Sequence, residues 1–228
     1  MFYWFMKTIV AGPLLRTLFR PRLEGLENIP ATGPVILASN HLSFIDSVIL
    51  PLMIKRRIYF LAASTYFQGG GLGKWAVKRF LLATGMIPID RSGGKASEAS
   101  LQAGMSVLTK GNVLGIYPEG GRSRDGKAHR GRTGVARLVF ESGAPVVPVA
   151  MIDTDKVMPS EGNGRVRIQR IGISFGPPLD FSEFDGKDRD HATLRIMTDR
   201  IMDAVVAMSG QEYVNEYGAA SRKKTLPE

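Results

Sequence analysis

The residues best suited to chemistry in this sequence are a histidine and an aspartate that follow a short apolar run. The segment Ser39-Asn-His-Leu-Ser-Phe-Ile-Asp46 comes directly after Val35–Ala38, whose composition is typical of a buried strand. A carboxylate that holds one ring nitrogen fixes the imidazole tautomer and stabilises the imidazolium, so the other nitrogen can take a proton from a hydroxyl. His41 and Asp46 are therefore candidates for a general base and its orienting group.

The spacing of this pair predicts the local backbone. His41 and Asp46 are five positions apart, and five residues of an ideal helix turn by about 500°, which leaves the two side chains roughly 140° apart. They can meet only if His41 lies in a loop and Asp46 in the first turn of the helix behind it. Ser43-x-x-Asp46 is a capping-box pattern, which predicts that this helix begins near Ser43. The alternative is that Asp46 only caps its helix and His41 is bonded by backbone.

The sequence offers no nucleophile of its own for covalent catalysis. It contains no cysteine and no Gly-x-Ser-x-Gly pattern, so we expect the reacting hydroxyl to belong to the substrate. The lack of cysteine also excludes a disulfide scaffold, thiolate zinc sites and iron–sulfur clusters. The sequence contains three histidines, which are His41, His129 and His191. We therefore expect no metal site, and we expect no cofactor.

A second candidate segment, Tyr117-Pro-Glu-Gly-Gly-Arg-Ser123, ends the apolar run Val113–Tyr117. Gly120 and Gly121 let backbone approach a ligand, and Arg122 carries a guanidinium fork that suits phosphate. Positions 122–137 hold a single acidic residue, Asp125, and six basic ones: Arg122, Arg124, Lys127, Arg130, Arg132 and Arg137. Such a loop repels itself unless an anion neutralises it. A solvated basic loop is the alternative.

Two further segments contain residue types that can bind phosphate. In Gly85-Met-Ile-Pro-Ile-Asp-Arg91 the last two residues form either a surface ion pair or a device that aims Arg91 at the site of Arg122. Gly69-Gly-Gly-Leu-Gly-Lys74 is not a P-loop, because Gln68 stands where the first glycine is needed and Trp75 replaces the hydroxyl residue. We expect a turn there, close to lipid, before a helix that contains Trp75.

Short apolar runs alternate with longer periodic stretches, which predicts an α/β fold with a mostly parallel central sheet flanked by helices. The expected strands are Val35–Ala38, Ile58–Ala62, Met86–Ile89, Val113–Tyr117, Val146–Met151 and Val166–Phe175. The expected helices are Ser47–Ile54, Leu72–Ala83, Ala96–Lys110, Thr133–Ser142 and His191–Met208.

Composition narrows the class of protein. The 228 residues are 44% hydrophobic and 22% charged, which excludes a collagen, a coiled coil and global disorder. Thirty Lys and Arg residues against twenty-one Asp and Glu give a net charge of +9. A surplus of this size favours anionic partners: nucleic acid, an anionic membrane or phosphorylated small molecules.

The first twenty residues are the most apolar part of the chain, yet Lys7, Pro13, Arg16 and Arg20 interrupt them too often for a membrane-spanning helix. Read as a helix, they place one polar stripe (Thr8, Gly12, Arg16 and Arg20) beside an aromatic and apolar body, which indicates an N-terminal amphipathic helix lying in a membrane surface. An ordinary amphipathic helix packed on its own domain is the alternative. A signal peptide is a third reading, although no small-residue cleavage site follows.

The order and spacing of the motifs resemble one family. Asn40-His41-x4-Asp46, Gly85-x-Ile-Pro-Ile-Asp-Arg91, Tyr117-Pro-Glu-Gly-Gly-Arg-Ser123 and Val146-Val-Pro-Val-Ala150 resemble the four ordered blocks of the glycerolipid acyltransferases. Within that family the nearest branch is the bacterial 1-acyl-glycerol-3-phosphate acyltransferase, or PlsC, type. The resemblance covers about residues 25–180. It divides the chain into a membrane-association segment (1–24), an acyltransferase domain (25–217) and a flexible tail (218–228).

The resemblance implies a reaction. His41, held by Asp46, would deprotonate the free glycerol hydroxyl of lysophosphatidate, which attacks the thioester of acyl-CoA or acyl carrier protein and gives phosphatidic acid. No covalent acyl-enzyme and no cofactor are implied. The substrate-binding residues would be Asn40, Arg91, Glu119, Gly120, Arg122, Ser123 and Arg132. The family also implies peripheral or monotopic attachment to the cytoplasmic face of the cell membrane.

Departures from the family pattern leave the acceptor open. Gly121 stands where the family usually has Thr, Tyr117 replaces a common Phe, and Ala63-Ser64-Thr65 lacks a frequent Lys, for which Arg132 could compensate. An acyltransferase for glycerol-3-phosphate or another lysophospholipid is the first alternative, and a lipid hydrolase is a more distant one. Nucleic-acid binding is not expected, because no helix-turn-helix, RNP or zinc pattern accompanies the positive charge.

Overall fold

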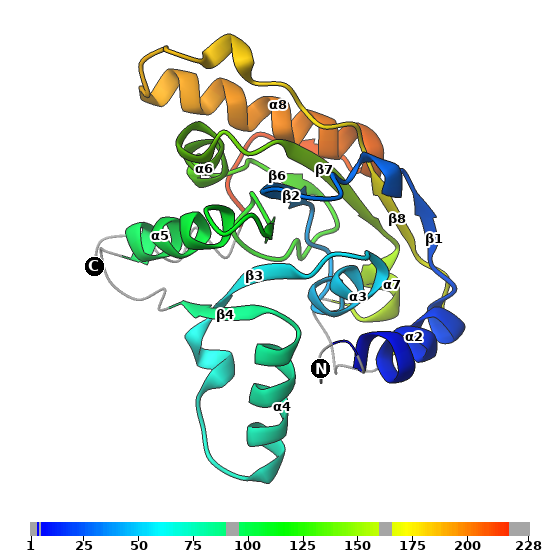
Figure 1. Cartoon of the computed structure of the whole chain (residues 1–228). Helices are drawn as coiled ribbons and strands as arrows, with labels where there is room; N and C mark the ends of the chain where they lie inside the picture. Colours follow the sequence, from blue (N-terminus) through cyan, green and yellow to red (C-terminus); the bar gives the residue numbers. More distant parts are fainter. Residues whose placement is uncertain (1–3, 5, 90–95, 160–165, 219–228) are drawn as a thin grey trace, which may run out of the picture.

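A seven-stranded sheet forms the centre of the molecule (Figure 1). The computed structural model describes residue 4 and residues 6–89, 96–159 and 166–218. The strand order is β1-β8-β7-β2-β5-β3-β4. The strands are β1 (Arg22–Glu24), β2 (Val35–Ser39), β3 (Ile58–Ala63), β4 (Met86–Ile89), β5 (Val113–Ile116), β7 (Val146–Ile152) and β8 (Gly172–Phe175). All described neighbours in this sheet are parallel except β7 and β8, which confirms the predicted fold class.

Helices cover both faces of the sheet, and β2 is therefore buried on both sides. Val35 and Leu37 point into one core with α3, and Ile36 and Ala38 point into a second core with α5, α6 and α8, as the two-residue period of a strand requires. The helices are α2 (Ala11–Phe19), α3 (Asp46–Met53), α4 (Leu72–Ala83), α5 (Ala96–Leu108), α6 (Gly134–Ser142), α7 (Thr154–Val157) and α8 (His191–Ser209). Figure 1 shows α5, α6 and α8 together on one side and α2 and α3 on the other.

Most predicted elements are present with ends within two residues of the prediction, and two predictions need correction. The expected strand Val166–Phe175 is reduced to β8, Gly172–Phe175, because its antiparallel partner β7 ends at Ile152, opposite Gly172. The helix expected to begin near Ser43 begins at Asp46. The sequence did not predict the short pairs β1–β8 and β6–β9, the latter formed by Ala128–His129 and Tyr213–Val214.

The N-terminal segment is helical, with a π-helical turn at Met6–Val10 that leads into α2. Phe19 is buried, whereas Trp4, Ile9 and Leu14 are 48%, 63% and 55% exposed. The expected polar stripe is broken at Gly12, which is buried: a Cβ there would lie 1.9 Å from the carbonyl oxygen of Lys7. The exposed surface of this segment therefore mixes basic and apolar side chains. Over the residues that the structure describes, no helix has the length and apolar character needed to cross a membrane.

Candidate active site

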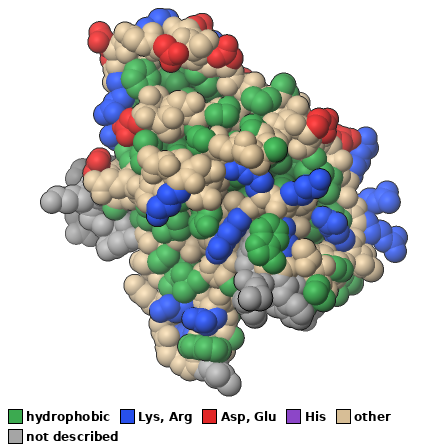
Figure 2. All heavy atoms as spheres, in the orientation of Figure 1, with side chains coloured by type: hydrophobic (Ala, Val, Ile, Leu, Met, Phe, Trp, Pro, Cys, Tyr) green, Lys and Arg blue, Asp and Glu red, His purple; other side chains and the backbone are tan. Residues whose placement is uncertain are grey.

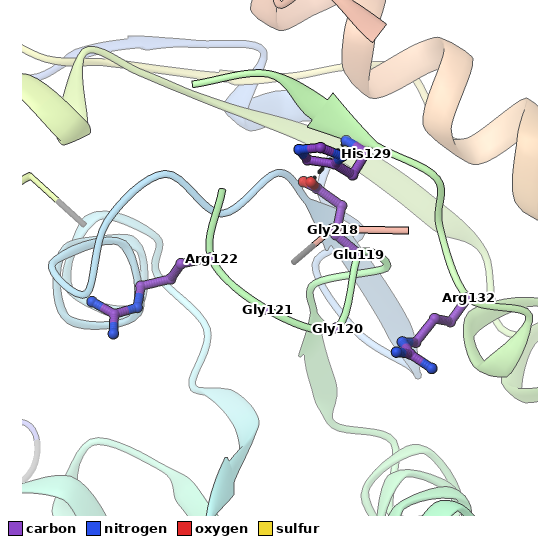
Figure 3. A pocket seen from close by; sticks show the side chains of 7 residues that line it. All are labelled: Glu119, Gly120, Gly121, Arg122, His129, Arg132 and Gly218. Atoms are coloured by element: carbon purple, nitrogen blue, oxygen red, sulfur yellow. Dashed lines mark hydrogen bonds between the residues drawn. The ribbon is translucent and has the colours of Figure 1, made fainter. Parts of the chain in front are cut away.

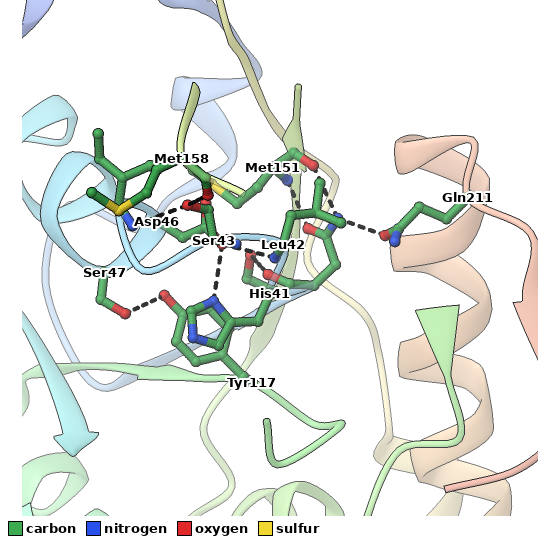
Figure 4. Close-up of polar contacts among 12 residues, drawn as sticks. His41, Leu42, Ser43, Asp46, Ser47, Tyr117, Met151, Met158 and Gln211 are labelled. Atoms are coloured by element: carbon green, nitrogen blue, oxygen red, sulfur yellow. Dashed lines mark hydrogen bonds and ion pairs between the residues drawn. The ribbon is translucent and has the colours of Figure 1, made fainter. Parts of the chain in front are cut away.

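The histidine–aspartate pair lies at the carboxyl end of β2. His41 belongs to the loop that follows this strand, and Asp46 is the first residue of α3. The Nδ1 atom of His41 lies 2.9 Å from Oδ2 of Asp46 (Figure 4). The predicted arrangement, with the histidine in the loop and the aspartate in the first helical turn, is therefore the one the structure shows.

Asp46 is fixed by the backbone of the same loop. Its Oδ2 atom also accepts hydrogen bonds from the N–H groups of Leu42, at 2.9 Å, and Ser43, at 2.8 Å. The bond from Ser43 is one half of the expected capping box. The other half is missing, because the Asp46 N–H donates to the Ser43 carbonyl, at 3.2 Å, and not to the Ser43 hydroxyl. That hydroxyl accepts from the N–H of Ile45, at 3.4 Å, and donates to the carbonyl of Met158. The buried carboxylate thus holds Nδ1 of His41 and leaves Nε2 on the opposite side of the ring.

Tyr117 covers one face of the His41 ring, a contact that the sequence did not predict. The two rings stack with centroids 3.8 Å apart and an angle of 9° between their planes. The Tyr117 hydroxyl lies 2.8 Å from the hydroxyl of Ser47 in α3, and burial, with a smaller effect of the Asp46 charge, raises the pKa of Tyr117 well above its ordinary value. The Tyr117 hydroxyl therefore ties the residue after β5 to α3.

Asn40 binds protein groups through its side chain. Its Nδ2 atom donates to the carbonyl of Met151 and to Oε1 of Gln211, at 2.9 and 2.7 Å, and its Oδ1 atom accepts from the N–H of Met151. The side chain is fully buried. Both ends of the amide bind protein groups and join the His41 loop to β7, while the contact of Asn40 with substrate stays a prediction.

The glycine-rich loop follows β5, and His41 follows β2. Because β2 and β5 are parallel neighbours, the carboxyl ends of both strands lie at the same edge of the sheet, and so do the two loops. Gly120 has φ of +80°, and a Cβ on it would lie 2.9 Å from Cδ of Arg132. A small cavity of about 40 Å³ is lined by Glu119, Gly120, Gly121, Arg122, His129, Arg132 and Gly218. In Figure 3 the guanidinium groups of Arg122 and Arg132 lie on opposite sides of the loop. Both arginines are exposed, and they do not converge on one point.

Glu119 is the buried member of this cavity. Its Oε2 atom accepts a 2.9 Å hydrogen bond from the N–H of His129, and its Oε1 atom is buried without a partner among the described residues. Burial raises the pKa of Glu119 to about 7 against the opposing effect of the His129 N–H. Near neutral pH this carboxyl therefore exists in both protonation states, so that it can accept or donate a hydrogen bond.

Ser123 joins the glycine-rich loop to the catalytic loop through its backbone. Its N–H donates to the carbonyl of His41 at 2.7 Å, while its hydroxyl donates to Asp125 at 3.2 Å. The side chain is buried. The predicted site residue Arg91 lies outside the described residues.

The segment after α8 completes the site, and no sequence motif marked it. Gln211 accepts the hydrogen bond from Asn40 and donates another to the carbonyl of Gly126 at 2.8 Å. The ring of Tyr217 lies 5.6 Å from the guanidinium carbon of Arg130 and 5.5 Å from that of Arg132, within cation–π range. Residue 218, where the predicted tail begins, lines the cavity, and residues 219–228 lie outside the described part of the chain.

A second cavity, of about 820 Å³, lies at the other end of α3. Its lining joins α2 and the turn before β2 to the last residues of α3 and includes Arg16, Arg20, Leu23, Ile29 and Met53. None of the predicted site residues lines it. It is separate from the His41 pair, since α3 starts with Asp46 at the site and ends at Met53 in the cavity wall.

The fold and site together define a class: an α/β protein with a histidine paired to a buried aspartate and a basic, glycine-rich loop at neighbouring parallel strands. The comparisons give the family. The model of the Acyltransferase family matches residues 20–152, so the chain belongs to this family.

Named relatives share part of their length with the chain. The chloroplastic 1-acyl-sn-glycerol-3-phosphate acyltransferase LPAT1 of Arabidopsis thaliana is 28% identical over 185 residues, which cover 81% of this chain and 50% of the relative. The 1-acyl-sn-glycerol-3-phosphate acyltransferase of Borreliella burgdorferi is 27% identical over 133 residues, or 58% of this chain and 51% of the relative. The chain thus spans about half the length of these curated relatives.

A solved structure shows the same fold. The 1-acyl-sn-glycerophosphate (LPA) acyltransferase PlsC of Thermotoga maritima superposes with a TM-score of 0.63 and 20% sequence identity. The match covers 91% of this chain and 87% of that one. The likeness therefore extends beyond the segment that the family model matches, into the region that holds α8.

Proposed function

We propose that this chain is a 1-acyl-glycerol-3-phosphate acyltransferase. The observation that carries the proposal is the 2.9 Å contact between Nδ1 of His41 and Oδ2 of the buried Asp46. Membership of the Acyltransferase family and the names of the relatives support the same reaction. The link from the Ser123 N–H to the His41 carbonyl holds the anion-binding loop beside the base.

The proposed chemistry is direct transfer. Nε2 of His41 takes the proton of the free glycerol hydroxyl. At the same time the hydroxyl oxygen attacks the thioester carbonyl of acyl-CoA or acyl carrier protein. The new ester C–O bond forms, the C–S bond breaks, and the imidazolium returns the proton to the leaving thiolate. Asp46 keeps Nδ1 protonated and stabilises the imidazolium while it exists. No acyl-enzyme forms, because the attacking oxygen belongs to the acceptor.

The phosphate of the acceptor is assigned to the basic loop. Arg122 and Arg132 lie on opposite sides of this loop, so each is proposed to bind a different phosphate, that of the acceptor or one of acyl-CoA, and Gly120 lets the backbone come close. Arg91 remains a proposed further ligand. Glu119, with its pKa near 7, is assigned to a glycerol oxygen, and the phosphates of acyl-CoA suit the surplus of positive charge.

Association with an anionic membrane on its cytoplasmic face, peripheral or monotopic, belongs to the same proposal. The exposed apolar side chains Trp4, Ile9 and Leu14 stand beside Arg16 and Arg20 on the N-terminal helix. Apolar and basic residues mixed in this way suit the boundary between headgroups and acyl chains. Residues 1–24 would be the membrane-association segment, and residues 25–217 the acyltransferase domain.

The test is thiol release from acyl-CoA in the presence of lysophosphatidate. The chain contains no cysteine, so a thiol-reactive dye reports the released CoA alone. His41→Ala should lower kcat by about 100-fold or more while the thermal unfolding curve stays that of the wild type. A kcat within a few-fold of wild type would remove His41 from the base role. Glycerol-3-phosphate as acceptor, acyl carrier protein as donor, and release of free fatty acid without acceptor would separate the alternative reactions.

A further inference from the structure

Helix α4 stands away from the body of the protein. It follows the 3-10 turn Ser64–Phe67 and the turn 68–71, and Figure 1 shows it projecting below the sheet. Trp75 and Val77 are 59% and 52% exposed, whereas Leu81, in the last turn, is 2% exposed. The helix is therefore anchored by its carboxyl end, and its first two turns face solvent.

One exposed stripe of α4 combines two apolar and two cationic side chains. Trp75, Lys78, Arg79 and Leu82 follow the spacing i, i+3, i+4 and i+7, which places them on the same side of a helix. All four are exposed, and the guanidinium carbon of Arg79 lies 6.0 Å from the Trp75 ring. Figure 2 shows hydrophobic and basic side chains gathered on the part of the surface that α4 forms. We call these four residues the α4 stripe.

The charge around the α4 stripe has a single sign. No Asp or Glu occurs between Ser47 and Ile89, while this stretch contains Lys55, Arg56, Arg57, Lys74, Lys78 and Arg79. A tryptophan flanked by Lys and Arg is suited to the headgroup region of a bilayer, where the ring stays at the interface and the long cationic side chains reach phosphates. An anionic surface is thus complementary to this helix.

The turn that leads to α4 contacts the loop that carries His41. The ring of Tyr66, in the turn that leads to α4, lies 6.1 Å from the ring of Phe44, three residues beyond His41. Tyr66 is itself 49% exposed. A surface that contacts both Tyr66 and the α4 stripe would therefore also lie close to the loop that carries His41.

We propose that the α4 stripe, together with Tyr66, docks on an anionic lipid bilayer and forms a second membrane contact beside the N-terminal segment. The inference rests on the proposed function, because a lipid acceptor must reach His41 from the membrane. Two contacts fix the orientation of the protein on the bilayer, whereas the N-terminal segment alone would leave it free to swing.

The two tryptophans of the chain allow a direct test. They are Trp4 and Trp75, so a Trp4→Phe variant reports on α4 alone. With vesicles of phosphatidylcholine and phosphatidylglycerol at a ratio of about three to one, the emission of Trp75 should shift to the blue and be quenched by brominated acyl chains. Lys78→Gln/Arg79→Gln in the same background should weaken vesicle binding by about tenfold or more, given roughly 1 kcal/mol for each surface cation.

The control is Lys110→Gln/Ile196→Gln, which changes an exposed basic residue in the turn after α5 and an exposed apolar residue on α8 and should leave binding at the wild-type level. Unshifted Trp75 emission on vesicles that retain the protein would overturn the proposal, as would a shift that appears without vesicles and marks self-association. Thiol release with a short-chain, soluble lysophosphatidate tests the proposed function separately. Quenching without thiol release would keep the bilayer contact and reject the enzyme activity.

Discussion

His41 is held by three contacts of different kinds. Asp46 binds Nδ1, Tyr117 stacks on the ring, and the Ser123 N–H binds the backbone carbonyl. The first contact sets the tautomer, the second the tilt of the ring and the third the position of the loop. In the proposed reaction, a base restrained in this way would lose little freedom when the acceptor binds, so its positioning would contribute to the rate before any proton moves.

Tyr117 tests the second contact. Tyr117→Leu removes the stack and should lower kcat by about tenfold, with KM for the acceptor unchanged, because the ring orients the base and does not bind phosphate. Tyr117→Phe is the matched variant: it keeps the stack, loses the bond to Ser47, and should cost about 1 kcal/mol of unfolding free energy in urea with kcat near wild type. Equal kcat values for the two variants would contradict the assigned role.

Glu119 gives a prediction for pH. Its pKa is raised by burial to about 7 from an ordinary 4.5, so the folded state binds the proton more tightly than the unfolded state. The stabilisation is complete below about pH 4.5 and is lost as the pH rises through about 7. A shift of this size corresponds to about 3 kcal/mol. The difference in unfolding free energy between wild type and Glu119→Gln, measured in urea from pH 5 to 8, should move in favour of the variant as the pH rises. Parallel pH profiles would contradict the raised pKa.

At this scale the sequence predicted the contact of His41 with Asp46, because five residues of chain join them and the capping pattern restricts the backbone between. The role of Asn40 could not be predicted in the same way. Its partners Met151 and Gln211 lie 111 and 171 positions away in the sequence. No local sequence pattern predicts which buried groups form hydrogen bonds over such separations.

At the scale of elements, local composition predicted the bounds of regular helices and strands but not the presence of the shortest strands. Helix Leu72–Ala83 and strand Met86–Ile89 have the predicted bounds, since each is marked by its own periodicity and flanking glycines. Strands β6 and β9 have two residues each and exist because the segment after α8 returns to the basic loop. That return depends on contacts between distant parts of the chain.

Substitutions at Gln211 test whether the segment after α8 supports the position of His41. Gln211→Ala removes the bonds to Asn40 and to the Gly126 carbonyl, and should cost about 1–2 kcal/mol of unfolding free energy and lower kcat several-fold. Gln211→Glu is the control, because its carboxylate can still accept from Asn40 but cannot donate to Gly126. If the link to Asn40 serves His41, kcat should fall in the alanine variant and be largely retained in the glutamate variant. A loss of kcat shared by both would place the effect in the basic loop instead.

At the scale of the whole molecule, the alternation of strands and helices was sufficient to predict the layers, because parallel strands need covering helices on both faces. The two cores on either side of the sheet differ in their relation to the site. The core on the α3 side contains Phe60, whose ring lies 5.3 Å from that of Tyr117. Tyr117 itself packs against this core. The core on the α5 side contains Leu138, and Tyr117 does not pack against it.

Gly115 and Gly104 allow the two cores to be disturbed separately. A Cβ on Gly115 would lie 2.3 Å from Cε1 of Phe60, and one on Gly104 would lie 2.9 Å from Cδ2 of Leu138. Gly115→Ala must displace the Phe60 ring, which supports Tyr117 and through it His41, so it should cost about 1–3 kcal/mol of unfolding free energy and lower kcat about tenfold. Gly104→Ala meets the end of a flexible side chain on the other face and should change stability less, leaving kcat as in wild type. Urea unfolding and thiol-release kinetics on the two variants measure both quantities. An equal loss of kcat would mean that strain crosses the sheet, and that the α3-side core has no special connection to the base.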